Sequence, residues 1–283
     1  MAKMYQLFKL YIRWALNTLD GIMKISLANK RALVCGASQG IGEAIAHKLS
    51  TAGAEVILIA RSKDKLESIL TQLPRENNQN HQCFALDLTN ECAIEETIDL
   101  VLKKGPISII INNSGGPKSG PLLQAESNDF LHAFQSHILA ASILSKRCFP
   151  GMKDQKFGRL INIISTSVKA PIPNLGVSNT IRGAMANWSK SLSIELAPFG
   201  ITVNNVLPGY TQTPRLDSLA LAAAQKQNKT VEEIKTLWKA LTPAGRFAAP
   251  EEIADAVTFL ASSQAAFITG INLPIDGGRT PCL

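Results

Sequence analysis

Residues 32–42 read Ala-Leu-Val-Cys-Gly-Ala-Ser-Gln-Gly-Ile-Gly, an apolar run that leads at once into three closely spaced glycines. The run has the length of a buried strand, and an apolar pattern with helical spacing begins at Ile41. Gly36 permits a tight turn, Gly40 lets the backbone approach a pyrophosphate, and Gly42 lets a helix pack closely on the strand. The stretch therefore predicts a strand, a phosphate-binding turn and a helix in succession.

The alternation of short apolar strands and longer helices continues to the end of the chain. Strands alternating with helices of about 10–15 residues are typical of βαβ units that build a buried parallel sheet with right-handed crossovers. We therefore expect an α/β fold, a doubly wound parallel sheet of the Rossmann type with helices on both faces. The expected strands are 32–35, 55–60, 83–88, 108–111, 159–164, 201–207 and 272–275. The expected helices are 41–52, 63–73, 91–103, 127–149, 178–197 and 250–262.

The domain organisation follows from the same pattern. The chain has 283 residues, 46% of them hydrophobic and 18% charged, which is an ordinary globular composition. Nothing in it resembles a linker, so we expect residues 24–283 to form one domain. Residues 214–246 are polar and helical and interrupt the alternation, which predicts an inserted helical lid.

Charge and cysteine usage exclude several classes of protein. The net charge is +7, and most of the excess lies in residues 1–31 rather than being spread over a domain, so we expect no nucleic-acid partner. The five cysteines are widely spaced and form no CxxC motif, which indicates free thiols in a reducing cytoplasm. The four histidines form no metal-binding pair, and we expect no metal site.

Residues 1–23 show the spacing of an amphipathic helix, with Lys9 and Arg13 on its polar stripe. These charges make it too polar to cross a bilayer, and it lacks the apolar core and cleavage site of a signal peptide. One interpretation is a helix that lies on a membrane surface, with the rest of the chain as its platform. The interpretation that we favour is a helix packed on the body or on a second subunit, or a start codon upstream of the domain.

Several motifs along residues 25–280 resemble, in order, those of the short-chain dehydrogenase/reductase family. The glycine turn corresponds to the family's T-G-x-x-x-G-x-G, with Cys35 in place of the threonine. The nearest group within the family looks like the 3-oxoacyl-acyl carrier protein reductases. The other matching motifs are Asp87 in Asp-Leu-Thr, Asn113-Ser114-Gly115, and residues 158–163, 208–213, 268–270 and 276–278.

The end of the second predicted strand bears on the choice of cofactor. An NAD site has an acidic residue there for the ribose 2′-hydroxyl, whereas a 2′-phosphate requires a cation. Here Arg61 and Ser62 follow the strand, and the first acid is Asp64. We therefore expect NADP(H), although Arg61 could also be a solvated loop cation. Together with the resemblance, this implies a cofactor site formed by Gly36, Ser38, Gln39, Gly40, Ile41, Gly42, Arg61, Ser62, Asp87, Leu88, Asn113, Gly115, Arg182, Pro208, Gly209, Thr211 and Thr213.

The catalytic positions depart from the family pattern. Active members use Asn, Ser, Tyr and Lys, the last two four residues apart. Ser165 stands at the serine position, but His137, Ser178 and Arg182 stand where Asn, Tyr and Lys are expected. Only one of the four residues implied by the resemblance is therefore retained.

These replacements change the acid–base chemistry that the site can perform. An aliphatic hydroxyl such as that of Ser178 is a far weaker acid than a phenol, and Arg182 stays charged and cannot join a proton relay. His137, with an ordinary pKa of about 6.5, suits a donor or a relay, although it could equally be a satisfied interior histidine. Tyr210 is a second candidate that could reach the substrate.

Besides a peripheral membrane protein that uses the fold only as a platform, two functions remain open at this stage. The first is an NADPH-dependent oxidoreductase that reduces a carbonyl, possibly a 3-oxoacyl thioester, with an atypical proton donor. The alternative is a catalytically impaired NADP(H)-binding sensor or scaffold. Lys118 and Lys169 follow predicted strand ends and could attract an acyl-carrier phosphate, or be ordinary loop lysines. The resemblance also implies a homo-oligomer, a tetramer or dimer, built in part on Ala184, Met185 and Trp188.

Overall fold

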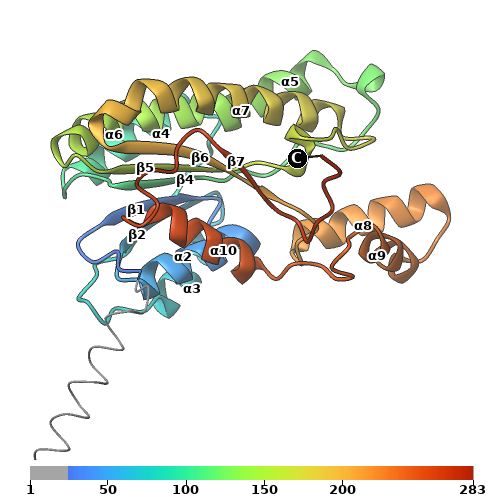
Figure 1. Ribbon diagram of the computed structural model, residues 1–283, viewed down its shortest axis with the longest axis horizontal. Coiled ribbons are helices and arrows are strands. Elements are labelled where there is room, and N and C mark those ends of the chain that lie inside the picture. Colours follow the sequence, from blue (N-terminus) through green and yellow to red (C-terminus); the bar gives the residue numbers. More distant parts are fainter. Residues whose placement is uncertain (1–24, 283) are drawn as a thin grey trace, which may run out of the picture.

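The computed structural model describes residues 25–282 and joins their seven strands in one sheet of order β3-β2-β1-β4-β5-β6-β7 (Figure 1). Every neighbouring pair is parallel, so the predicted doubly wound α/β fold is confirmed. The predicted amphipathic helix at residues 1–23 lies outside the described residues. The strands are β1 (Arg31–Cys35), β2 (Glu55–Ala60), β3 (Gln82–Ala85), β4 (Ile109–Asn112), β5 (Gly158–Ile163), β6 (Ile201–Pro208) and β7 (Asn272–Ile275).

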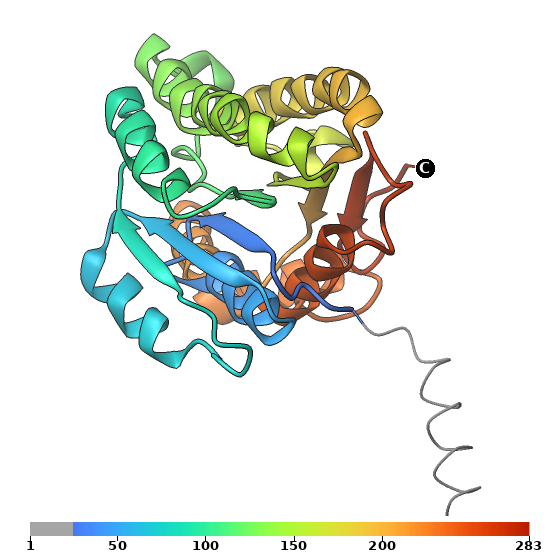
Figure 2. The same cartoon turned by 90° about the vertical axis from the view of Figure 1, so that its left-hand side faces the viewer.

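Helices cover both faces of the sheet, as Figure 2 shows along its edge. One layer holds α2 (Gly40–Thr51), α3 (Lys63–Gln72) and α10 (Pro250–Ala261), and the other holds α4 (Glu91–Leu102), α6 (Ala140–Asp154) and α7 (Gly176–Leu196). Each layer has its own apolar core against the sheet. The central strands are consequently buried on both faces, which explains why they read as continuous apolar runs rather than alternating ones.

The direction of winding reverses between β1 and β4. β1 pairs with β2 on one side and with β4 on the other, so the loops after β1 and β4 diverge from adjacent strand ends. Ligands of open α/β sheets bind in the crevice at such a switch point, outside the carboxyl ends of the strands. The glycine turn and the Asn113 motif both lie at this crevice.

Two segments differ from the sequence-based expectation. Strand β3 ends at Ala85 rather than at residue 88, because its only partner, β2, ends at Ala60 in register with it. The long helix expected at 127–149 is divided into α5 (Ser127–Phe134) and α6 by a π-helical turn at Gln135–Leu139. Such turns insert one residue into a helix and often occur at functional sites.

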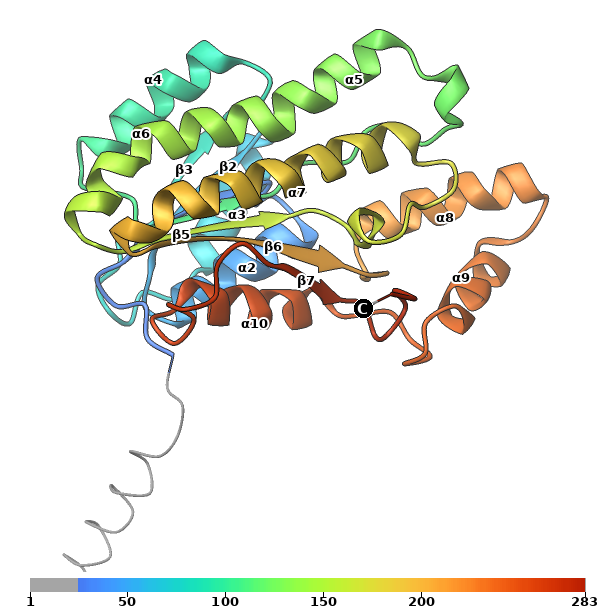
Figure 3. The same cartoon turned by 45° about the horizontal axis from the view of Figure 1, so that its top comes forward.

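Residues 214–246 form two helices, α8 (Pro214–Gln227) and α9 (Val231–Ala240), which stand beyond the carboxyl ends of β6 and β7 (Figure 3). Thr213 and Thr230 cap their amino ends, each accepting a hydrogen bond from a backbone N–H of the first turn. Across residues 25–282, no helix has the length and apolar character needed to span a bilayer.

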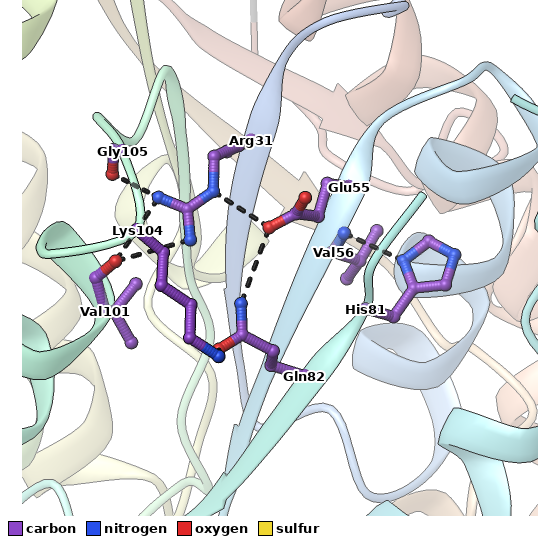
Figure 4. A network of polar contacts seen from close by, with 8 residues as sticks. All are labelled: Arg31, Glu55, Val56, His81, Gln82, Val101, Lys104 and Gly105. Carbon is purple, nitrogen blue, oxygen red and sulfur yellow. Dashed lines mark hydrogen bonds and ion pairs between the residues drawn. The ribbon is translucent and has the colours of Figure 1, made fainter. Parts of the chain in front are cut away.

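A polar network ties together the amino ends of β1, β2 and β3 (Figure 4). Arg31 donates to Glu55 at 2.9 Å and to the carbonyls of Val101 and Gly105, which close the carboxyl end of α4. Gln82 also donates to Glu55, at 3.4 Å. The network lies at the edge opposite the crevice and serves the scaffold rather than the site.

Candidate active site

The glycine turn packs directly on the loop that follows β4. Gly36 has a φ of +61°, and a side-chain carbon there would lie 2.5 Å from the Asn113 carbonyl oxygen. A carbon at Gly42 would lie 2.1 Å from the Gly36 carbonyl oxygen, so only glycine fits. Asn113 donates its side-chain amide to the carbonyls of Cys35 and Gly36, each at 3.3 Å. The predicted residues of the two loops are therefore brought together.

The amino end of α2 opens onto this turn. Its N-cap residue, Gln39, makes no side-chain capping bond, and its amide oxygen instead accepts a hydrogen bond from Lys65 at 3.1 Å. Gly40 lies against Thr213, whose methyl group would be 3.1 Å from a side-chain carbon at position 40. The backbone N–H groups of the first turn of α2 are thus left for an anion, as a dinucleotide pyrophosphate requires.

The residues predicted for the adenosine half lie at the ends of β2 and β3. Arg61 is exposed, and Ser62, the N-cap residue of α3, makes no side-chain capping bond. Hydrogen bonds from the backbone and side chain of Thr89 lower the pKa of Asp87, and the Arg61 guanidinium lowers it further. Leu88 lines a small cavity with Asn113. Arg61 and Ser62 thus lie directly after β2, the strand end at which the sequence predicts a 2′-phosphate to bind.

At the reaction end, His137 lies in the π-helical turn and contacts Ser114. The imidazole is buried, and its Nδ1 is hydrogen-bonded to the Ser114 hydroxyl. Burial and the Arg182 guanidinium hold the pKa of His137 well below its ordinary value, and a hydrogen bond with the Gly115 backbone offsets this in part. The imidazole is therefore neutral at neutral pH, with Nδ1 positioned to accept the hydroxyl proton.

Arg182 completes this cluster from α7. It donates to the Ile163 carbonyl at 2.8 Å and to the Ser114 carbonyl at 3.5 Å. The side chain is buried, and this desolvation, with a contribution from Arg215, lowers its pKa to about 10. Arg182 is still charged at neutral pH and holds the loop after β4 against the end of β5.

A ladder of four asparagine side chains fixes the position of α7 along the sheet. Side-chain hydrogen bonds join Asn112 to Asn162 at 2.7 Å, Asn162 to Asn205 at 2.9 Å and Asn205 to Asn272 at 2.8 Å. Asn162 also donates to Ser189 of α7 at 2.8 Å. Because Ser189 lies two helical turns after Arg182, this ladder across β4 to β7 positions the guanidinium over the strand ends.

Ser165 and Ser178 are the other two predicted catalytic residues. Neither of them lines the cavity that His137 and Arg182 line. Ser165 follows β5, and its hydroxyl accepts a hydrogen bond from the Ser167 backbone at 3.1 Å. Ser178 is half-buried in the first turn of α7, one turn before Arg182. The cavity is lined by His137, Arg182, Asn113 and Leu88, and by Ser114, which sequence reasoning treated only as part of a motif.

The candidate Tyr210 is held in a different environment. Its ring stacks on Trp238 of α9 with the centroids 5.0 Å apart, and Arg279 lies over it at 4.2 Å. Its hydroxyl accepts a hydrogen bond from Arg279 at 3.3 Å. The pKa of Tyr210 is raised by burial. Tyr210 thus connects the lid to the carboxyl-terminal segment and is absent from the cavity that holds His137.

The remaining predicted residues lie at the ends of β6 and β7. Gly209 follows Pro208 and packs on the backbone of Asp276, where a side-chain carbon would be 2.7 Å from its Cα. The Thr211 hydroxyl donates to the Gly209 carbonyl at 3.2 Å. This turn connects β6 to the Thr213 cap of α8, and so links the sheet to the lid.

The sequence and the fold are similar to those of known proteins. A family model described as enoyl-(acyl carrier protein) reductase matches residues 36–280. The chain belongs to the short-chain dehydrogenase/reductase family. It is 34% identical over 257 residues to the 3-oxoacyl-[acyl-carrier-protein] reductase FabG of Vibrio cholerae, covering 90% of this chain and 98% of the relative.

Solved structures of the family superpose closely on this chain. L-sorbose reductase from Gluconobacter frateurii, complexed with NADPH and L-sorbose, has a TM-score of 0.86, 26% identity and coverage of 92% of this chain and 100% of its own. A 3-ketoacyl-(acyl-carrier-protein) reductase from Brucella melitensis, complexed with NADH, has a TM-score of 0.78, 28% identity and coverage of 90% and 100%. The chain is accordingly a short-chain oxidoreductase by family.

Proposed function

We propose that the protein is an NADPH-dependent reductase of a carbonyl compound with an atypical proton route. The observation that carries the proposal is the juxtaposition at one crevice of the glycine turn and the Ser114–His137–Arg182 cluster. Gly36, Gly42 and Asn113 pack so closely that no side chain fits at either glycine. Bare backbone therefore borders the open amino end of α2, and this surface fits a dinucleotide pyrophosphate. Arg61 and Ser62 fit the 2′-phosphate of NADPH.

The chain must then supply a proton to the carbonyl oxygen. The bound cofactor supplies a hydride to the carbonyl carbon. The oxygen of Ser165 accepts from the Ser167 N–H, so its own proton is free to hydrogen-bond the substrate carbonyl. The Ser114 hydroxyl and His137 form a relay, in which the imidazolium of His137 re-protonates Ser114 as Ser114 gives its proton to the carbonyl oxygen.

The test begins with NADPH titration by fluorescence, followed by NADPH oxidation with a panel of ketones and 3-oxoacyl thioesters. Because the pKa of His137 is lowered, only its small protonated fraction can feed the relay at neutral pH. The rate should therefore rise as the pH falls, about tenfold per pH unit above that pKa. In His137→Asn the profile should become flat, whereas Ser165→Ala should lower the rate at every pH.

Ser178 and Arg182, at the Tyr and Lys positions, also support the alternative function. A protein that binds NADPH tightly but oxidises it with no carbonyl of the panel would be a cofactor-binding sensor or scaffold. Rapid turnover that is indifferent to Ser114→Ala, His137→Asn and Ser165→Ala would instead refute the proposed proton route.

Two further properties belong to the proposal. The free state of all five cysteines supports a reducing cytoplasmic location. We also expect a homo-oligomer, a tetramer or dimer, to be measured by sedimentation. Ala184 and half-buried Trp188 are available for such an interface, but Met185 is not, because it faces the sheet and is only 2% exposed.

A further inference from the structure

Two arginines from separate elements face the loop that follows β4. Arg182 of α7 donates to the carbonyl of Ser114, and Arg215, in the first turn of α8, donates to the carbonyl of Pro117 at 3.0 Å. The Arg215 guanidinium also approaches Gly116, where a side-chain carbon would lie 3.4 Å from its Nη2. The loop 114–117 thus has a guanidinium at each end.

Neither guanidinium has a negatively charged partner. The ion pairs found in residues 25–282 involve other residues. Desolvation lowers the pKa of both arginines, and Arg215 lowers that of Arg182 further, with no carboxylate acting in the opposite direction. His137 is the third basic group, and its pKa is lowered first by burial and then by the charges of Arg182 and His132.

Such an arrangement is costly without an anion. The buried guanidinium of Arg182 requires a counter-charge, and repulsion by the exposed Arg215 guanidinium adds to that requirement. Backbone carbonyls use only part of the five N–H donors of each arginine, and the remaining donors suit the planar geometry of a carboxylate. The phosphate-binding turn already has its own N–H groups at α2, whereas Arg182 lies beside Ser114 and His137 at the reaction end.

We propose that Arg182 and Arg215 together bind the carboxylate of the substrate, which makes the substrate an oxo acid rather than a neutral ketone or thioester. The inference rests on the proposed reductase function and specifies its substrate class. The carboxylate lies over the loop 114–117, and the substrate carbonyl lies beside Ser114 and His137. Arg182 is buried and fixes one end, while exposed Arg215 closes on the anion from the lid side.

The first test measures binding without turnover. The probe is oxamate, an unreactive analogue of a 2-oxo acid, titrated by calorimetry into the full-length protein loaded with NADP+. Arg215→Met should weaken oxamate binding about tenfold or more, because a charge-assisted hydrogen bond is lost, and Arg215→Lys should recover part of the loss. Arg75→Met is the matched control, since Arg75 is an exposed arginine near His81, at the opposite edge of the sheet.

The second test compares acetoacetate with ethyl acetoacetate, which differ in the carboxylate alone. The wild type should have at least about a tenfold higher kcat/KM for the acid, and Arg215→Met should bring the ratio of acid to ester near one. Preference for the ester, or a ratio that Arg215→Met leaves unchanged, would overturn the inference while leaving the reductase proposal intact. Failure to reduce any carbonyl would refute the reductase proposal, and the oxamate titration would still test the two arginines.

The cofactor diphosphate is the other anion that these arginines could meet. NADPH titration of the same variants separates the two sources. If the arginines bind the substrate, the dissociation constant of Arg215→Met for NADPH should stay within about twofold of the wild-type value. A tenfold loss of NADPH affinity with unchanged oxamate binding would assign the arginine to the cofactor and overturn the inference.

Discussion

The two halves of the crevice differ in how closely they follow the family. In the half around β1 and β2, the glycine turn matches the family motif except at Cys35, and Gly36 and Gly42 lie against backbone that admits no side chain. In the other half, His137, Ser178 and Arg182 stand where the resemblance implies other residues, and a polar cluster joins Arg182 of α7 and His137 of the π-helical turn to Ser114 of the loop after β4. Binding and proton transfer therefore impose separable constraints on the same fold.

The largest effect is expected from the cofactor half. Gly42→Ala places a carbon 2.1 Å from the Gly36 carbonyl oxygen, so the turn must move. We expect a loss of NADPH affinity of at least about 100-fold by fluorescence titration, with a lowered Tm, since overpacking costs about 1–3 kcal/mol. Gly183→Ala on α7 should leave NADPH affinity unchanged, because an added side-chain carbon there would meet no atom within 4 Å beyond its chain neighbours and the adjacent helix backbone. Equal NADPH affinities of the Gly42→Ala and Gly183→Ala variants would contradict this expectation.

The next effect concerns the reaction half. Ser178→Tyr combined with Arg182→Lys restores the family pair on one face of α7, four residues apart. Because a matched general acid contributes about 10²–10⁴-fold, we expect kcat for reduction of a neutral ketone such as ethyl acetoacetate, which has no carboxylate for residue 182 to bind, to rise at least about 100-fold. Ser178→Phe with Arg182→Lys supplies the ring without the hydroxyl and should not raise the rate. An equal increase of kcat in the Ser178→Phe control would show that the phenol hydroxyl does not cause the increase.

Cofactor choice should respond more modestly. Arg61→Asp replaces the proposed partner of the 2′-phosphate with an acceptor for a ribose hydroxyl. We expect NADPH to bind the wild type at least about tenfold more tightly than NADH, and the variant to reverse this order. Lys63→Met removes a nearby cation that pairs with Glu67 and should keep the wild-type order. Equal affinities in the wild type would refute the role of Arg61.

The smallest effect is a pH dependence of stability in the scaffold of the cofactor half. His81 Nδ1 accepts the Val56 N–H at 2.9 Å (Figure 4). Its Nε2 is hydrogen-bonded to the Pro74 carbonyl at 2.8 Å, and the two bonds together require a neutral ring. Burial accordingly lowers its pKa. The stabilisation is present above the unfolded pKa of about 6.5 and is lost as the pH falls through the lower folded value.

Urea unfolding at a series of pH values measures this dependence. His81→Gln should be less stable at neutral pH and should lose less stability on acidification than the wild type. His47→Gln on α2 is the control and should retain the wild-type slope. A His81→Gln slope equal to that of the wild type would show that other groups carry the pH dependence.

Local sequence patterns were sufficient for most of the fold. Apolar runs such as those around Leu33 and Ile57 identify buried strands because both faces of a parallel sheet are covered. The strand–glycine–helix order predicts the cofactor end of the crevice. It can do so because the tight turn after the strand requires glycine, and this requirement is a local property of the backbone. The placing of His137, Ser178 and Arg182 at catalytic positions came from the family resemblance, by counting from its motifs, and stays a prediction.

The tertiary structure decided which side chains meet. Strand β3 is shorter than its apolar pattern because its partner ends first, and the π-helical turn at His137 gave no periodic signal. The Ser114–His137 contact and the approach of Arg215 to Pro117 join residues far apart in the chain. Hydrophobic periodicity specifies which face of an element is buried, but strand order, helix rotation and loop path determine which polar groups share that interior.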